Sequence, residues 1–190
     1  TQHQNISHYP IHIKLDTGMH RLGFEPHLIS ELCSLLKNNN FVKVKSVFSH
    51  LAASDDLQFD DFTKLQFQRF DAMYSELEKV LPSKPIRHIL NTSGIFNYAE
   101  KQMEMVRLGI GLYGIGNSEQ ELKVLENVST LKTIISQIRE VLPEESIGYS
   151  RRFRVTQKMK VATIPIGYAD GIRRAWGNEK GFVTINNQKA

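Results

Sequence analysis

Hydrophobic and polar positions alternate over residues 11–16 and take helical spacing over residues 25–40. In residues 11–16, IHIKLD, apolar side chains alternate with ionisable ones. Side chains point alternately to the two faces of a strand, so this pattern predicts a strand with one apolar face. Residues 25–40 place leucine and isoleucine at intervals of three and four, which predicts an amphipathic helix. Strand, loop and helix in this order are typical of a β/α unit.

Three further units follow in the same order, which gives four predicted β/α units. In the second strand the even-numbered residues from Val42 to His50 are assigned to one face. The fourth strand is apolar almost throughout, as is typical of a strand buried on both faces, although three glycines interrupt it. Asp60 or Asp61 is expected to cap the longest helix. The predicted strands are residues 41–50, 87–91 and 105–115, and the predicted helices are residues 60–81 and a helix from residue 92.

The sequence pattern changes after Gly116. From there on, hydrophobic and polar positions alternate without long helical stretches, which predicts a mainly β region. Residues 125–140 and 151–165 have the pattern of strands, and 181–190 that of a hairpin with its turn at Asn186-Asn187. We therefore divide the chain into residues 1–121, a partial barrel, and 122–190, the first part of a β domain. Four β/α units are half of a (β/α)8 barrel, whose open sheet edges must be covered by further chain or by another copy.

Composition narrows the functional classes. The chain has 190 residues, of which 41% are hydrophobic and 23% charged, as is ordinary for a soluble globular protein. The net charge is +4, but Lys and Arg are scattered without an aromatic platform, so nucleic acid is not an expected partner. A single cysteine excludes an internal disulfide and a thiolate metal site, and favours a reducing, cytoplasmic compartment. We expect neither a membrane span nor a signal peptide, and we expect this chain to be part of a longer protein.

Polar residues gather at the predicted carboxyl ends of the strands, where β/α folds carry their chemistry. Lys14 and Arg21 lie at and beyond the end of the first strand, and His50 ends the second. Arg107 lies within an apolar strand, and a buried guanidinium without a partner is costly, so it requires an acceptor. Considered alone, His50 is more often a satisfied core histidine, and Arg21 a solvated loop residue.

A phosphate site is predicted at the third and fourth units. Thr92 and Ser93 open a helix directly after Asn91, and a helix start offers hydroxyl caps and free N–H groups. Gly109 and Ile110 offer backbone amides in the next unit. Barrel enzymes often hold phosphate with the loops after strands seven and eight, so these positions fit if the four strands are the last four of a barrel. The alternative is an ordinary hydroxyl cap of a helix.

Six motifs occur in order along the chain: KLDTGMHRLGF, FSHLAASDD, HILNTSG, MVRLGIGLYG, IGYSRRF and IPIGYADG. Together they resemble the alanine racemase family, pyridoxal-phosphate enzymes with a (β/α)8 barrel followed by a β domain. The resemblance implies an α/β fold that comprises strands five to eight of that barrel and the first part of the β domain. It also implies that the lysine bound to the cofactor precedes residue 1, and that a later segment of the β domain follows residue 190.

The resemblance implies roles for the residues at the strand ends. Lys14 matches a lysine that is often carbamylated, and Arg21 an arginine that bonds the phenolic oxygen of the cofactor and the substrate carboxylate. Arg107 is implied to pair with His50 and to donate to the pyridine nitrogen. Because a guanidinium keeps its proton, that nitrogen stays largely unprotonated, and the cofactor is a weaker electron sink.

Residues of the β domain and of one loop complete the implied site. Tyr149 matches the catalytic tyrosine, and a phenol with a reference pKa of about 10 needs neighbouring positive charge to act as a base. Tyr168, Asp170 and Asp55 match the region of the substrate entrance. No metal is implied.

The implied activity of the full-length protein is interconversion of L-alanine and D-alanine, which supplies D-alanine for peptidoglycan. The implied assembly is a cytoplasmic homodimer with shared active sites. Removal and return of the α-proton on opposite faces need two bases, of which this chain carries one, so we expect the chain alone to be inactive. Two alternatives stay open, a non-catalytic pyridoxal-phosphate-binding barrel in cofactor homeostasis and an inactive interaction fragment. IGYSRRF and IPIGYADG argue against the first, because such barrels lack the β domain.

Overall fold

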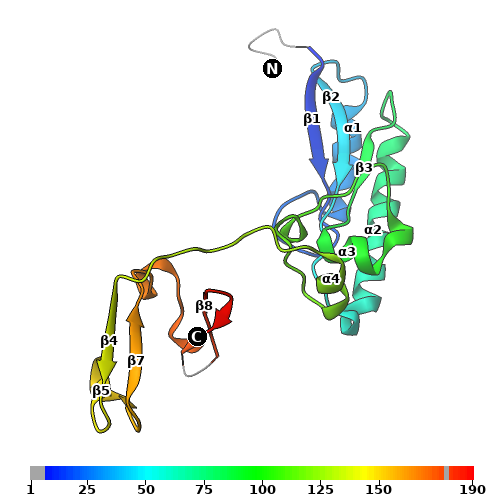
Figure 1. Ribbon diagram of the computed structural model, residues 1–190. Coiled ribbons are helices and arrows are strands. Elements are labelled where there is room, and N and C mark those ends of the chain that lie inside the picture. Colours follow the sequence, from blue (N-terminus) through cyan, green and yellow to red (C-terminus); the bar gives the residue numbers. More distant parts are fainter. Residues whose placement is uncertain (1–6, 178–179) are drawn as a thin grey trace. The chain divides into compact units, whose positions relative to one another are not determined.

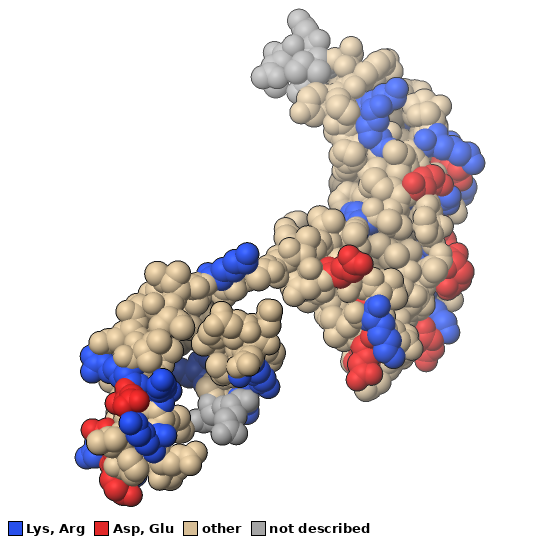
Figure 2. All heavy atoms as spheres, viewed as in Figure 1, with Lys and Arg blue, Asp and Glu red and all other residues tan. Residues whose placement is uncertain are grey.

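The computed structural model describes residues 7–177 and 180–190. Contacts divide the chain between Ser129 and Thr130 into an N-terminal part and a C-terminal part, and each is described by itself. No helix in the described ranges is both long enough and apolar enough to cross a bilayer. On the face of the molecule shown in Figure 2, Lys and Arg side chains lie interspersed with Asp and Glu.

The N-terminal part is an α/β layer built on a parallel three-stranded sheet (Figure 1). The strands lie in the order β1, β2, β3, and Lys14, Phe48 and His88 are neighbours across them. The strands are β1 (Tyr9–Lys14), β2 (Val42–Phe48) and β3 (Ile86–His88), and the α-helices are α1 (Ile29–Leu36), α2 (Asp60–Glu78), α3 (Thr92–Asn97) and α4 (Glu119–Val124). The predicted alternation of strand and helix is confirmed for the first three units.

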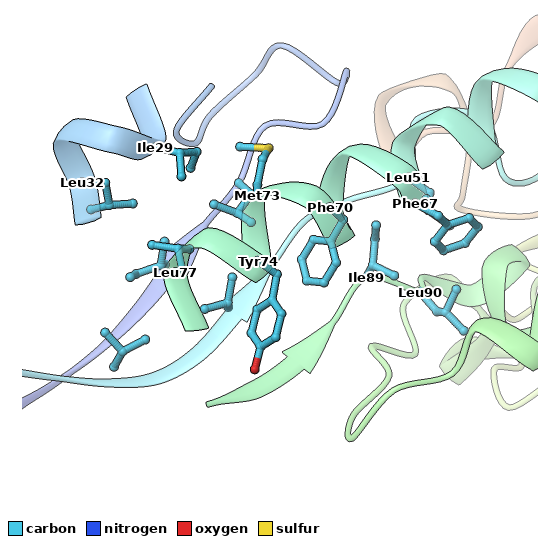
Figure 3. Close-up of a cluster of buried hydrophobic side chains, with 14 of the residues drawn as sticks. Ile29, Leu32, Leu51, Phe67, Phe70, Met73, Tyr74, Leu77, Ile89 and Leu90 are labelled. Atoms are coloured by element: carbon cyan, nitrogen blue, oxygen red, sulfur yellow. The ribbon is translucent and has the colours of Figure 1, made fainter. Parts of the chain in front are cut away.

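The core lies between the sheet and helices α1 and α2. Helix α2 presents Phe70, Met73 and Leu77 at helical spacing. Figure 3 shows Met73 and Leu77 toward Ile29 and Leu32 of α1, and Phe70 beside Ile89. Phe70 and Leu77 are fully buried. Burial of a large apolar side chain contributes roughly 1.5–3 kcal/mol, so this stripe holds α2 in place against the strands.

A β-bulge in β2 changes which residues share a face. Ile11 pairs with Val44 and His12 with Ser46, so Lys45 is skipped in the ladder. Beyond the skipped residue the alternation is inverted, and Val47 rather than Ser46 joins the hydrophobic core. The predicted assignment of all even-numbered residues from 42 to 50 to one face is therefore wrong, because one extra residue inverts the alternation.

The predicted fourth strand, residues 105–115, is not a regular strand. We call residues 105–115 the fourth segment. Met105 N and Arg107 N donate to the Arg87 and Leu90 carbonyl oxygens at 3.3 and 3.1 Å, so the segment starts to pair beside β3. Pairing stops at Gly109, where φ of −101° and ψ of −110° turn the backbone out of the extended conformation, and a 3-10 helix, η5 (Ile110–Tyr113), follows. The backbone conformation at the glycines, rather than the apolar pattern, therefore determines where the strand ends.

Two further predictions in this part are wrong. Helix α4 occupies residues 119–124, where the sequence pattern predicted β structure from residue 122. Its N-cap Ser118 accepts from Glu121 N, a strong local start signal for a helix. Neither Asp60 nor Asp61 caps α2, because Asp56 caps a preceding 3-10 helix, η3 (Leu57–Phe59), that runs directly into α2. The other 3-10 helices of the N-terminal part are η2 (Pro26–Leu28) and η4 (Ala99–Lys101).

The C-terminal part contains small antiparallel sheets, as the mainly β prediction requires. Strand β4 begins only at Gln137, so the predicted strand over residues 125–140 is confirmed only at its end. Asn186 and Asn187 both have positive φ, 50° and 63°, which is the geometry of a tight hairpin turn, and the predicted hairpin is confirmed. The strands are β4 (Gln137–Val141), β5 (Ser146–Ile147), β6 (Phe153–Arg154), β7 (Met159–Thr163), β8 (Thr184–Ile185) and β9 (Gln188–Lys189), and the 3-10 helices are η6 (Tyr149–Arg151), η7 (Tyr168–Asp170) and η8 (Arg174–Trp176).

Candidate active site

A closed loop after β1 carries Arg21. Asp16 N donates to the Phe24 carbonyl oxygen at 2.8 Å, and Phe24 N donates to the Lys14 carbonyl oxygen at 2.9 Å, so the loop returns to its own strand. Gly23 has φ of 122°, and a Cβ there would lie 2.9 Å from Asp16 N, so only glycine fits this close return. The loop thereby holds Lys14 and Arg21 at the carboxyl end of β1.

Arg107 is a half-buried cation held by carbonyl oxygens and a histidine. Its Nη2 lies 2.5 Å from the Ser49 carbonyl oxygen, 3.2 Å from that of Ile89 and 3.2 Å from His50 Nδ1. The guanidinium also lies over the Phe48 ring, 5.1 Å from its centroid. Among the described residues, no carboxylate pairs with Arg107 and no protein acceptor meets its Nε or Nη1. The N–H groups at Nε and Nη1 can therefore donate to a ligand.

The contact with Arg107 determines which ring nitrogen of His50 carries the proton. A guanidinium only donates, so His50 Nδ1 accepts and the neutral ring carries its proton on Nε2. Burial lowers the pKa of His50, and the charges of Arg107, Arg21 and Lys14 lower it further. The pKa of Lys14 is also lowered, first by burial and then by Arg21 and Arg107. Arg107, Arg21 and Lys14 form a cationic cluster around the neutral His50, which favours a bound anion and increases the neutral fraction of Lys14.

Thr92 and Ser93 supply hydroxyl groups at the start of α3, next to the fourth segment, which carries Arg107. The buried Thr92 Oγ1 accepts from Gly109 N at 3.0 Å and from Gly111 N at 3.2 Å, and Ser93 Oγ accepts from Asn117 Nδ2 at 3.1 Å. A hydroxyl that accepts these bonds still has its own hydrogen to donate. Neither hydrogen has an acceptor in the described part of the chain, so the pair fits an anionic oxygen such as that of a phosphate.

Asn91 and Gly109 make hydrogen bonds within the chain, and the cofactor-binding role predicted for them and for Ile110 stays a prediction. Asn91 Oδ1 accepts from Gly94 N at 2.9 Å and from Ser54 Oγ at 2.7 Å, so this side chain caps α3 and ties a loop to it. Gly109 N is engaged by Thr92, and Ile110 begins η5. At Gly111 a Cβ would lie 2.7 Å from Thr92 Cγ2, so glycine permits the close approach of the fourth segment to α3.

The remaining predicted residues lie in exposed positions. Tyr149, in the C-terminal part, opens η6 and is 97% exposed, and Tyr168, which opens η7, is 74% exposed. Asp170 accepts from Gly167 N at 2.8 Å, and Arg174 lies over the Tyr168 ring. Asp55, in the N-terminal part, is exposed in the turn after β2. The functional roles of all these residues stay predictions.

The sequence pattern missed one buried polar residue behind the cluster. Gln66 lies on the buried stripe of α2 with Phe67 and Phe70, and its side chain reaches the loops after β1 and β2. A glutamine at a core position of an amphipathic helix was the available signal, since a buried amide requires hydrogen-bond partners.

Comparison with known proteins agrees with these motifs. The family model for the N-terminal domain of alanine racemase matches residues 2–117, and that for the C-terminal domain matches residues 128–190. Alanine racemase 1 of Oceanobacillus iheyensis is 36% identical over 180 residues, which are 93% of this chain and 47% of the relative. The chain thus spans about half the length of the curated relatives it matches.

Solved structures give the same result for the fold. A Clostridium difficile 630 alanine racemase has a TM-score of 0.81 at 29% identity, with 99% of this chain and 49% of that one covered. An alanine racemase from Bartonella henselae, with covalently bound pyridoxal phosphate, has a TM-score of 0.73 at 29% identity, with 95% and 48% covered. The predicted fold class, half of a (β/α)8 barrel followed by β structure, is confirmed.

Proposed function

The chain belongs to the alanine racemase family, and we propose that the complete protein interconverts L-alanine and D-alanine with bound pyridoxal phosphate. Two observations carry the proposal. Arg107 has no carboxylate partner among the described residues, and the Thr92 and Ser93 hydroxyls each have a hydrogen left to donate. A phosphorylated, electron-withdrawing nitrogen heterocycle has the matching groups: its phosphate would accept from the two hydroxyls and its ring nitrogen from Arg107.

The residues of this site divide between the two ends of such a cofactor. Thr92 and Ser93 would donate their hydroxyl hydrogens to the phosphate, with a further N–H from Ile110, since Gly109 N and Gly111 N already donate to Thr92. Arg107 would donate to the ring nitrogen and, because it keeps its proton, would leave that nitrogen unprotonated. Asn91 supports this region as the cap of α3. When bound, pyridoxal phosphate withdraws electrons from the substrate α-carbon and makes its hydrogen acidic.

The cationic cluster would orient the amino acid. Arg21 presents a planar, permanently charged fork for the substrate carboxylate. Lys14, whose pKa is lowered, has a larger neutral fraction than a free lysine, and a neutral amine is the form that reacts with carbon dioxide. A carbamate at Lys14 would be an anion beside Arg21 and would hold that side chain in place. His50 stays neutral and fixes Arg107.

Tyr149 is proposed as the base that holds and returns the α-proton on one face. We propose that it acts in the site of a second copy, in a homodimer, and that Tyr168, Asp170 and Asp55 shape the substrate entrance. The proposed cellular role is the supply of D-alanine for peptidoglycan in the cytoplasm. The match of a C-terminal domain model to residues 128–190 favours this proposal over a cofactor-handling barrel without a β domain.

The proposal is tested with the complete protein and pyridoxal phosphate. L-Alanine is added, and chiral chromatography follows the appearance of D-alanine, with L-serine and L-lysine as competing substrates. We expect conversion of alanine to an equal mixture of both enantiomers, and loss of most activity in Arg21→Ala. If the cofactor-loaded protein racemises no alanine, the proposal is wrong.

A further inference from the structure

A buried glutamine joins the loop after β1, which carries Arg21, to the loop after β2, which carries His50. Gln66 is fully buried on α2. Its Nε2 donates to Thr17 Oγ1 at 3.2 Å and to the His50 carbonyl oxygen at 3.1 Å, while its Oε1 accepts from Ala52 N at 2.9 Å. Thr17 belongs to the loop after β1, and His50 and Ala52 to the loop after β2, so one side chain spans both.

The hydrogen-bond direction in this network is determined by its ends. The Ala52 amide can only donate, which identifies the amide oxygen of Gln66 and places its NH2 group toward Thr17. At the other end the Leu15 carbonyl oxygen can only accept, so Ser49 Oγ donates to it at 2.7 Å. The Thr17 hydroxyl, 2.8 Å from Ser49 Oγ, must then donate to Ser49. Every donor in the chain from Gln66 to Leu15 therefore has one defined acceptor.

This network includes two residues that hold Arg107. The Ser49 carbonyl oxygen and His50 Nδ1 both accept from Arg107 Nη2. Gln66 holds the backbone of His50, and through Thr17 it holds Ser49. Gln66 touches neither Arg107 nor the cationic side chains, so its effect on them passes through the backbone of residues 49 and 50.

From these contacts we infer that Gln66 is a positioning residue that sets the geometry of the His50–Arg107 pair. The inference rests on the proposed function only for its effect on turnover. Loss of Gln66 frees the His50 carbonyl and the Ala52 amide, so the His50 ring moves relative to Arg107. The charged groups that face this ring are Arg107, Arg21 and Lys14. Each lowers the pKa of His50, and greater separation from them raises it.

The test uses Gln66→Met in the complete protein, since methionine fills the same volume without polar atoms. We expect the pKa of His50, followed by NMR of ¹³C-labelled histidine, to rise toward its ordinary value. We expect kcat to fall about tenfold while KM stays within about twofold. Gln66→Glu keeps an acceptor for Ala52 and loses both donated bonds. It should likewise raise the pKa of His50 and lower kcat.

Two variants on the same helix serve as controls. Gln68→Met changes an exposed glutamine and should alter neither quantity, and Phe70→Leu disturbs the core and should lower Tm without a change in the pKa of His50. If Gln66→Met lowers Tm as Phe70→Leu does but leaves the pKa of His50 and kcat unchanged, Gln66 is merely structural and the inference is wrong. If the pKa shifts but no variant or parent protein racemises alanine, the proposed function fails and the positioning role stands.

Discussion

Replacement of Thr92 by valine tests the hydroxyl that gathers the backbone of the fourth segment. Valine has the shape of threonine, so packing at this buried position is kept while the hydroxyl is lost. Two amides, Gly109 N and Gly111 N, then lose their acceptor. The change is therefore a nearly pure removal of one oxygen that serves two donors.

The magnitude follows from the burial of the two amides. Gly111 is buried, and an unsatisfied buried donor costs about 1–3 kcal/mol. Gly109 is exposed and can bond water instead, so its loss is about 0.5–1 kcal/mol. The sum predicts that Thr92→Val lowers the free energy of unfolding by about 1.5–4 kcal/mol. Thr92→Ser keeps the oxygen and loses one methyl group, which costs about 1 kcal/mol.

The assay is urea unfolding of the complete protein at 25 °C, followed by circular dichroism, together with amide hydrogen exchange at Gly111. We expect Thr92→Val to be less stable than Thr92→Ser and Gly111 to exchange at least about tenfold faster, since 1.4 kcal/mol corresponds to a factor of ten. Equal stability of the valine and serine variants, with unchanged exchange at Gly111, would refute the view that this hydroxyl organises the fourth segment.

Three further predictions concern Arg107, Glu104 and Tyr149. Arg107→Glu should let the pyridine nitrogen take a proton, change the visible absorption of the bound cofactor and lower racemisation; unchanged spectra and turnover would contradict the assigned role. Arg87 holds the pKa of Glu104 at about 2, below its ordinary value of 4.5, so the native state binds fewer protons and stability falls as the pH drops from about 4.5 to 2. Acid titration of Glu104→Gln should show a flatter decline in this window than the parent protein. Mixing of Arg107→Glu with Tyr149→Phe under subunit exchange should restore activity if Tyr149 acts in a second copy; verified exchange without recovery places Tyr149 in its own chain or outside the chemistry.

Periodicity predicted the first three β/α units because their apolar stripes are also their buried stripes, as Phe70 and Leu77 show. Periodicity failed where local backbone geometry determines which face a residue lies on or where a strand ends. The bulge at Lys45 inverts the faces of β2, and Gly109 ends the pairing of the fourth segment after Arg107. Neither event changes the hydrophobic pattern, so neither is visible in it.

The residue types of the candidate site could be predicted from the sequence, but the hydrogen bonds that hold those residues in place could not. Arg107 lay in an apolar run, and Thr92 lay at a helix start, so both drew attention from the sequence alone. The contact between Arg107 and His50, which the family resemblance implied, is present. The network of Gln66, Thr17 and Ser49 was not predicted, because hydrogen bonds between segments far apart in the chain have no sequence period.

The parallel sheet also fixes the order in which this chain can acquire structure. Lys14 pairs with Phe48, and Phe48 with His88, so the two ladders join residues that are 34 and 40 positions apart in the chain. Such pairing requires closure of a long loop before any strand contact is gained, and it is slow compared with helix formation. By contrast, Ile185 meets Gln188 across a two-residue turn. The β8–β9 hairpin can therefore form on the microsecond scale, long before the strands that carry the cationic cluster meet.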